Sequence, residues 1–120
     1  MIFQQELEAI CQEAPGCHEA VLMNFDGLVV FRHVVKESDI NAEDFLVELT
    51  DAIKRTQQAV GSANGGGLGE FTLAFDKATL VVRFLKDDHF VALLMEPTAL
   101  EGRGRYALRC HSLALAQELV

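Results

Sequence analysis

The chain has 120 residues, of which 50% are hydrophobic and 23% charged, with a formal net charge of −8. This length predicts one domain, residues 1–120, that buries roughly two-thirds of the surface of the unfolded chain. The acidic balance disfavours nucleic acid and anionic membrane surfaces as partners, because both would be repelled.

We expect neither a targeting segment nor a membrane span. Its first residues lack the basic region and long apolar core of a signal peptide, and no apolar run approaches the ~18 residues of a membrane span. Cys11, Cys17 and Cys110 are an odd number of cysteines in a chain large enough to fold without disulfides. We therefore expect free thiols and a cytoplasmic protein.

The first predicted elements are a helix and a hairpin. Apolar residues recur at helical spacing from Ile2 to about Ala14, before Pro15-Gly16 ends the helix. The segment Ala20–Arg32 then predicts two strands, because Asp26-Gly27 favours the positive φ angles of a tight turn and Asn24 can bond the nearby backbone. Both strands are apolar on both faces, so we expect other elements to cover each side of the hairpin.

A long helix is predicted next. Asn41 is a suitable N-cap, and Glu43 and Asp44 favour the positive end of the helix dipole. An apolar stripe runs for about five turns before the glycine-rich segment 61–69 ends the helix. The stripe consists of Ala42, Phe45, Leu46, Leu49, Ala52, Ile53, Thr56 and Val60. The opposite, polar face carries Glu48, Asp51, Lys54, Arg55 and Gln58.

Three strands and a helix complete the chain. The strands Glu70–Phe75, Ala78–Leu85 and Phe90–Met95 are joined by short polar connections, which predicts an antiparallel meander. The last helix is expected over Gly102–Glu118 after Pro97 ends the third strand. Its apolar contacts are expected from Tyr106, Leu108, Leu113, Leu115 and Leu119. The predicted class is α+β, with five antiparallel strands and helices on both faces.

This order of elements resembles the roadblock family of dynein light chain roadblock-type domains. The resemblance rests on the opening helix, the strands around Asn24–Gly27, the acidic helix start at Asn41–Asp44, the glycine-rich exit and the glycine-containing entry to the last helix. It extends to the bacterial branch that includes gliding-motility GTPase activators. It implies a profilin/longin-like three-layer sandwich in the order α-β-β-α-β-β-β-α, with the long helix on one face and the two terminal helices on the other.

The resemblance also implies a dimer, formed with a second copy or with a roadblock paralogue. The strand Glu70–Phe75 would pair with its counterpart, and the long helices would lie side by side. Elementary physics agrees, because an apolar edge strand without Lys or Pro invites association unless something covers it. The implied interface residues are Phe45, Leu49, Ile53, Thr56, Glu70, Phe71, Thr72, Leu73, Ala74 and Phe75.

The function implied by the resemblance is non-enzymatic. Bacterial members bind a Ras-like small GTPase on the paired long helices, and some stimulate its GTP hydrolysis. The corresponding contact residues here are Glu48, Asp51, Lys54, Arg55 and Gln58. The alternative is a nucleotide-independent structural adaptor in a motor, polarity or signalling complex. A ligand-sensing domain and an enzyme are less favoured, because the sequence predicts a filled core and contains no recognisable nucleophile, metal set or acid–base pair.

Four further motifs have simpler interpretations. The segment Gly65–Gly69 lacks the preceding strand, the following helix and the Lys-Ser/Thr of a phosphate-binding loop. The histidines and cysteines show no metal-ligand spacing, and we expect Cys11 and Cys110 to face inward. Asp87-Asp88-His89 is expected to form a turn rather than part of a catalytic triad. The cluster Arg103, Arg105 and Arg109 remains a candidate contact for an anion or an acidic partner. No cofactor and no metal are predicted.

Overall fold

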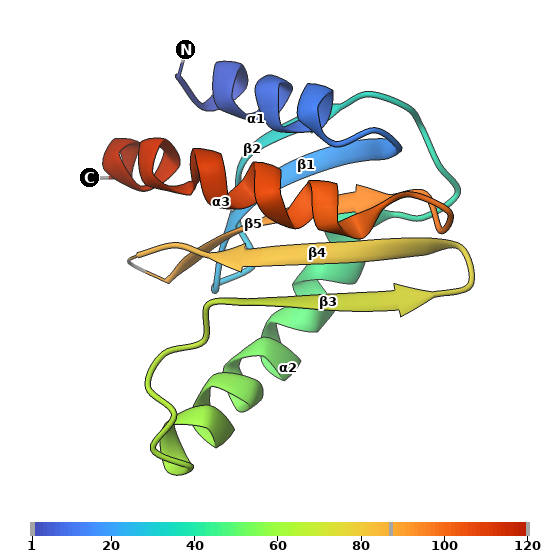
Figure 1. Ribbon diagram of the computed structural model, residues 1–120. Coiled ribbons are helices and arrows are strands. Elements are labelled where there is room, and N and C mark those ends of the chain that lie inside the picture. Colours follow the sequence, from blue (N-terminus) through green and yellow to red (C-terminus); the bar gives the residue numbers. More distant parts are fainter. Residues whose placement is uncertain (1, 87, 120) are drawn as a thin grey trace.

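The computed structural model describes residues 2–86 and 88–119, which form three helices and one five-stranded antiparallel sheet (Figure 1). The strand order is β2-β1-β5-β4-β3. The elements are α1 (Ile2–Glu13), β1 (Cys17–Asn24), β2 (Val29–Val34), α2 (Ala42–Ser62), β3 (Glu70–Phe75), β4 (Ala78–Phe84), β5 (His89–Met95) and α3 (Glu101–Glu118). This order confirms the predicted α-β-β-α-β-β-β-α arrangement.

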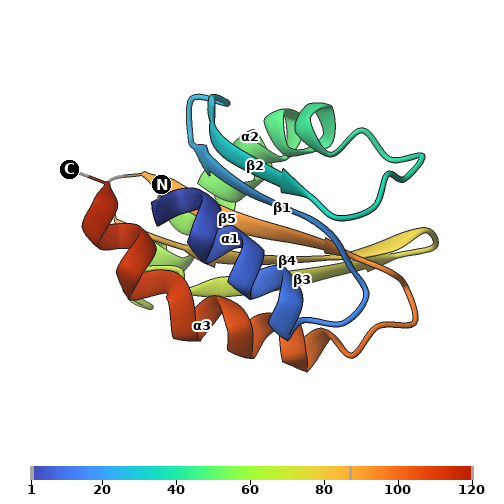
Figure 2. The same cartoon turned by 90° about the horizontal axis from the view of Figure 1, so that it is seen from above.

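The helices form a layer on each face of the sheet. Figure 2 shows α1 and α3 side by side on one face and α2 on the other. Alternate residues of the central strands divide between two cores: Leu22 packs on the side of α1 and α3, whereas Val21 and Met23 pack on the side of α2. The predicted three-layer sandwich, with the long helix alone on its face, is therefore confirmed.

The hairpin is covered on both faces only in its first strand. Every residue of β1 except Asn24 is buried, whereas β2 lies at the end of the strand order and alternates between partly buried and exposed positions. The expectation that both strands are covered was wrong for β2, where Val30 and Val34 are exposed, as is Leu28 just before the strand. An apolar run does not reveal whether its strand lies at the centre or the edge of a sheet.

The long helix begins as predicted. The Asn41 side chain caps it by accepting a hydrogen bond from the backbone N–H of Asp44 at 3.1 Å. Its buried stripe is shorter than the sequence indicated, because no described residue of α2 beyond Ile53 is buried. Figure 1 shows the reason: the second half of α2 runs past β3 and beyond the edge of the sheet. Ala52 and Thr56 are consequently exposed.

The last helix buries fewer apolar side chains than predicted. Leu108, Leu115 and Leu119 are buried, but Tyr106 and Leu113 are 68% and 69% exposed. Cys110, which was expected to face inward, is also exposed. The sequence of α3 is apolar on two sides, and only the side that carries Gly104, Leu108 and Leu115 faces the sheet.

Gly104 allows α3 to approach β5 closely. A Cβ atom at this position would lie 2.7 Å from the Met95 sulfur and 3.4 Å from Leu93 Cδ1. Both of those side chains are fully buried, so neither has free space into which it could move. The absence of a side chain at Gly104 therefore sets the spacing between helix and sheet.

We expect Gly104→Ala to destabilise the fold by about 1–3 kcal/mol through overpacking, although alanine is the better helix former. Denaturant unfolding would measure the change. Gly102→Ala is the matched control in the same helix, because its Cβ would meet only Arg105 Nη2 at 3.6 Å. Equal effects of the two substitutions would contradict this account of α3 packing.

His111 joins the two terminal helices. Its Nδ1 lies 2.5 Å from Glu6 Oε2 and its Nε2 lies 2.7 Å from Glu13 Oε2, so both ring nitrogens face carboxylates of α1. Burial opposes the charged form of the ring, but the hydrogen bonds to Glu13 and Glu6 and the attraction of both carboxylates outweigh it and raise the pKa of His111. The imidazolium can donate to both carboxylates at once.

We expect the contribution of His111 to folding stability to depend on pH. Because its pKa is raised in the folded state, the contribution is fully present below the ordinary histidine pKa of about 6.5 and is lost as pH rises through the folded pKa. Denaturant unfolding from pH 5.5 upward should show the loss in the unchanged protein. In His111→Gln the loss of stability with rising pH should be smaller than in the unchanged protein. Equal losses in the two proteins would contradict the assignment to His111.

Candidate protein-interaction surface

β3 is an edge strand, and within the described part of the chain one of its two sides has no neighbouring strand. It pairs with β4 alone, in a regular register that runs from Glu70 opposite Arg83 to Phe75 opposite Ala78. The other edge strand, β2, differs, because its pairing with β1 shifts between Leu22 and Met23. A bulge of this kind protects an edge from further pairing, whereas a regular strand offers its free N–H and C=O groups to another strand.

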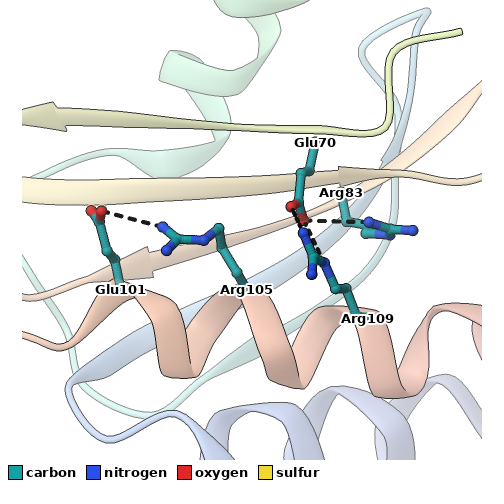
Figure 3. A network of polar contacts seen from close by, with 5 residues as sticks. All are labelled: Glu70, Arg83, Glu101, Arg105 and Arg109. Carbon is teal, nitrogen blue, oxygen red and sulfur yellow. Dashed lines mark hydrogen bonds and ion pairs between the residues drawn. The ribbon is translucent and has the colours of Figure 1, made fainter.

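The two faces of β3 carry different side chains. Phe71 and Phe75 pack partly against the core beneath α2, and Leu73 on the same face is 38% exposed. Glu70 lies on the opposite face, toward α3, as Figure 3 shows. The exposed Leu73 therefore carries apolar surface to the free edge of the sheet.

An apolar depression connects this edge with the start of α2. It has a volume of about 460 Å³ and is lined by Ile40, Asn41, Phe45, Leu73 and Phe75. The rings of Phe45 and Phe75 meet edge to face, with centroids 5.5 Å apart, and so fix the start of α2 against β3. Sequence reasoning placed both phenylalanines in an interface but did not identify their contact within one chain.

The flank of α2 that faces the β3 edge carries large apolar side chains near its start and small side chains farther along. At about 100° per residue, Leu49, Ala52 and Thr56 follow Phe45 along this flank. Leu49 is half-buried, whereas Ala52 and Thr56 are exposed, and the Thr56 hydroxyl donates to the Ala52 carbonyl at 2.8 Å. Ile53 was assigned to the same surface, but at 1% exposure it lies in the core of the single chain and cannot form part of that surface.

The polar face of α2 is open to solvent. Its exposed side chains are Glu48, Asp51, Lys54, Arg55 and Gln58. Lys54 lies toward the β1–β2 turn, where it borders a hollow of about 500 Å³ together with Asp26 and Gln57. The remaining four project away from the sheet, so the structure brings the five residues together on one continuous side of the helix.

The arginines of α3 are largely committed to contacts within the chain. Figure 3 shows Arg109 and Arg83 converging on the Glu70 carboxylate, and Arg105 beside Glu101 at 3.2 Å. The hydrogen bond from Arg109, reinforced by Arg83, lowers the pKa of Glu70. This network connects the first residue of β3 to α3. The sequence alone could not predict it, because Glu70 and Arg109 are 39 positions apart.

Arg103 differs from the other two arginines. No ion pair of its side chain occurs within the described ranges 2–86 and 88–119. It borders a surface hollow with Pro15, Gly16 and Glu96. The three arginines thus do not converge on one point, and Arg103 alone of them remains open to a partner.

The other motifs fall into structural roles. The glycine-rich segment joins α2 to β3, and Asp88 has a positive φ of 58° while its carbonyl accepts a hydrogen bond from the Phe25 N–H. Asp87 lies outside the described residues. Among the residues that the structure describes, no three His, Cys, Asp or Glu side chains are grouped to hold a metal ion. No helix in this part of the chain has the length and apolar character to span a membrane.

The sequence matches no model of a known protein family and no curated protein. Solved structures, however, share its fold. A Roadblock/LC7 domain from Streptomyces avermitilis is 19% identical with a TM-score of 0.82, covering 96% of this chain and 95% of that one. MglC from Myxococcus xanthus is 25% identical with a TM-score of 0.70, covering 98% and 99%. The gliding protein MglB from Thermus thermophilus is 18% identical with a TM-score of 0.85, covering 97% and 87%.

These likenesses confirm the resemblance that the sequence suggested. A profilin is also among the structural neighbours, in agreement with the predicted fold class. The similarity extends over nearly the whole chain, so it concerns the complete arrangement of sheet and helices rather than a shared motif. The chain therefore has the Roadblock/LC7 fold.

Proposed function

We propose that this protein is a non-enzymatic regulatory subunit that dimerises through β3 and α2 and binds a Ras-like small GTPase. The observation that carries the proposal is the regular, apolar edge strand beside the apolar flank of α2. The structural similarity of the chain to MglB and MglC supports a role as a regulator of the kind found in gliding motility. The setting would be the cytoplasm, and the partner subunit a second copy or a related chain.

The free edge of β3 supports the proposed dimer. Pairing β3 with the β3 of a second copy joins two five-stranded sheets and satisfies the outer backbone groups of both strands. The same association brings the two α2 helices together, because α2 extends past the sheet edge (Figure 1). The small side chains of Ala52 and Thr56 permit a close approach, while Phe45, Leu49 and Leu73 lose exposed apolar area.

The GTPase would dock on the polar faces of the paired α2 helices. Glu48, Asp51, Lys54 and Arg55 present both signs of charge, which suits recognition of a specific protein surface rather than of one anion or cation. Any stimulation of hydrolysis would act by repositioning the catalytic groups of the GTPase itself.

The dimer is tested by Leu73→Glu, which should leave the chain monomeric. A charged carboxylate at this position would have to be buried against the partner strand, which costs more than the edge pairing returns. Sedimentation equilibrium or light scattering measures the mass. Leu28→Glu is the control, since it introduces the same charge at an exposed leucine beside the opposite edge of the sheet. A folded Leu73→Glu dimer would refute pairing through β3.

The partner is tested by affinity capture from the cells of origin, in parallel with a non-hydrolysable GTP analogue and with GDP. We expect a small GTPase to be retained with the analogue and lost with GDP. Equal retention in both arms would instead favour the nucleotide-independent adaptor. Retention of no GTPase in either arm would contradict the proposed partner, whatever the oligomeric state.

The docking face is tested by charge reversal. Arg55→Glu, alone or with Lys54→Glu, should weaken binding of the captured GTPase by about tenfold or more while the protein stays dimeric. Isothermal calorimetry gives the affinity. Arg103→Glu is the matched control, because it reverses an exposed arginine on the opposite face of the sheet. Loss of binding in the control alone would place the contact on α3.

A further inference from the structure

Two buried thiols lie in contact beneath the first helix. Cys11 in the last turn of α1 and Cys17 at the start of β1 are 8% and 6% exposed, and their sulfur atoms are 2.9 Å apart. The Cys17 thiol also lies 3.6 Å from the Glu19 carbonyl, which can accept its proton, and either sulfur can donate to the other. A disulfide bond of about 2.05 Å needs the sulfurs to approach by only about 0.9 Å.

The connection between the two elements holds the thiols together. The Cys17 N–H donates to the Ala14 carbonyl at 3.1 Å, and Gly16 adopts a φ of +90° that glycine tolerates best. A Cβ atom at Gly16 would lie 2.7 Å from the Ala99 Cβ, so this turn is also closely packed. Because α1 and β1 are fixed on both sides of the turn, the two sulfurs stay near each other without a covalent bond.

A small oxidant has a route to one of the two sulfurs. Cys11 borders a surface hollow of about 330 Å³, whose other lining residues are Glu8, Gln12, His33, Val34 and Val35. Cys17 does not line this hollow. The hydrogen bond with Cys11, followed by burial, raises the pKa of the Cys17 thiol and disfavours its thiolate. The first attack therefore falls to Cys11, and Cys17 is placed to resolve it.

We propose that Cys11 and Cys17 are a site of reversible oxidation by peroxide, which joins them in a disulfide between α1 and β1. The Cys11 sulfur attacks one oxygen of hydrogen peroxide, the O–O bond breaks, and a sulfenic acid and one water form. The Cys17 sulfur then attacks the Cys11 sulfur, and the second oxygen leaves as water with the thiol proton. In sum, two thiols and one peroxide give one disulfide and two waters.

The bond would lock the end of α1 to the sheet. In a reducing compartment it would form only under oxidative load and would be reversed by dithiol reductants. The site is separate from β3 and from the polar face of α2, so its test does not depend on the proposed partner.

The sequence allows a clear experiment on the unmodified protein. Trypsin cuts first after Arg32, so Cys11 and Cys17 fall in one peptide, residues 1–32, whereas Cys110 falls in residues 110–120. The folded protein is treated with hydrogen peroxide, denatured, alkylated and digested, and the masses of the peptides are measured by mass spectrometry. We expect peptide 1–32 to lose two hydrogens and to accept no alkylating agent, and dithiothreitol to restore two alkylation sites.

Several outcomes would overturn the proposal. These are alkylation of both thiols in peptide 1–32 after peroxide, sulfinic acid at Cys11 without a crosslink, or a disulfide that joins either thiol to Cys110. Thermal unfolding gives a second readout, since the bond should raise the melting temperature by about 5 °C. The rise should persist in Cys110→Ser and vanish in Cys17→Ser, and a rise that requires Cys110 would contradict the assignment.

Discussion

The apolar character of the central strands on both of their faces is the constraint on which the structure depends. β1, β4 and β5 direct alternate side chains into two separate cores, so the sheet needs a helical layer on each side. The two terminal helices form one layer and α2 forms the other (Figure 2). Gly104 then sets how closely α3 lies on the sheet, because a side chain there would collide with the buried Met95.

A sheet of this kind leaves two edges, and the chain treats them differently. The pairing of β2 with β1 is interrupted by a register shift, and its Arg32 forms an ion pair with the largely buried Glu19 at 2.5 Å. β3 has neither a shift nor a proline, and it carries Leu73 to the free side. The proposed dimer interface is therefore at the β3 edge and not at the β2 edge, and the part of α2 that extends beyond β3 lies beside it.

Ion pairs at the periphery of the apolar cores connect α3 to the sheet and to α1. Glu70 receives Arg83 from the neighbouring strand and Arg109 from α3, so the start of the edge strand is tied to the helix layer (Figure 3). His111 does the same between α3 and α1 through two glutamates. These contacts explain why part of the arginine cluster serves the fold, although its sequence pattern suggested an external ligand.

The sequence by itself determined the order of the elements and the Asn41 cap, because these depend on local periodicity, capping and turn chemistry. Tertiary structure alone decided which apolar side chains are covered. Ile53 is buried while Thr56 is exposed, since α2 leaves the sheet between them, and Tyr106 faces solvent because Gly104 turns the other side of α3 inward. It also decided that Glu70 meets Arg109 and that Cys11 meets Cys17, because contacts of this kind arise only when separate elements pack together.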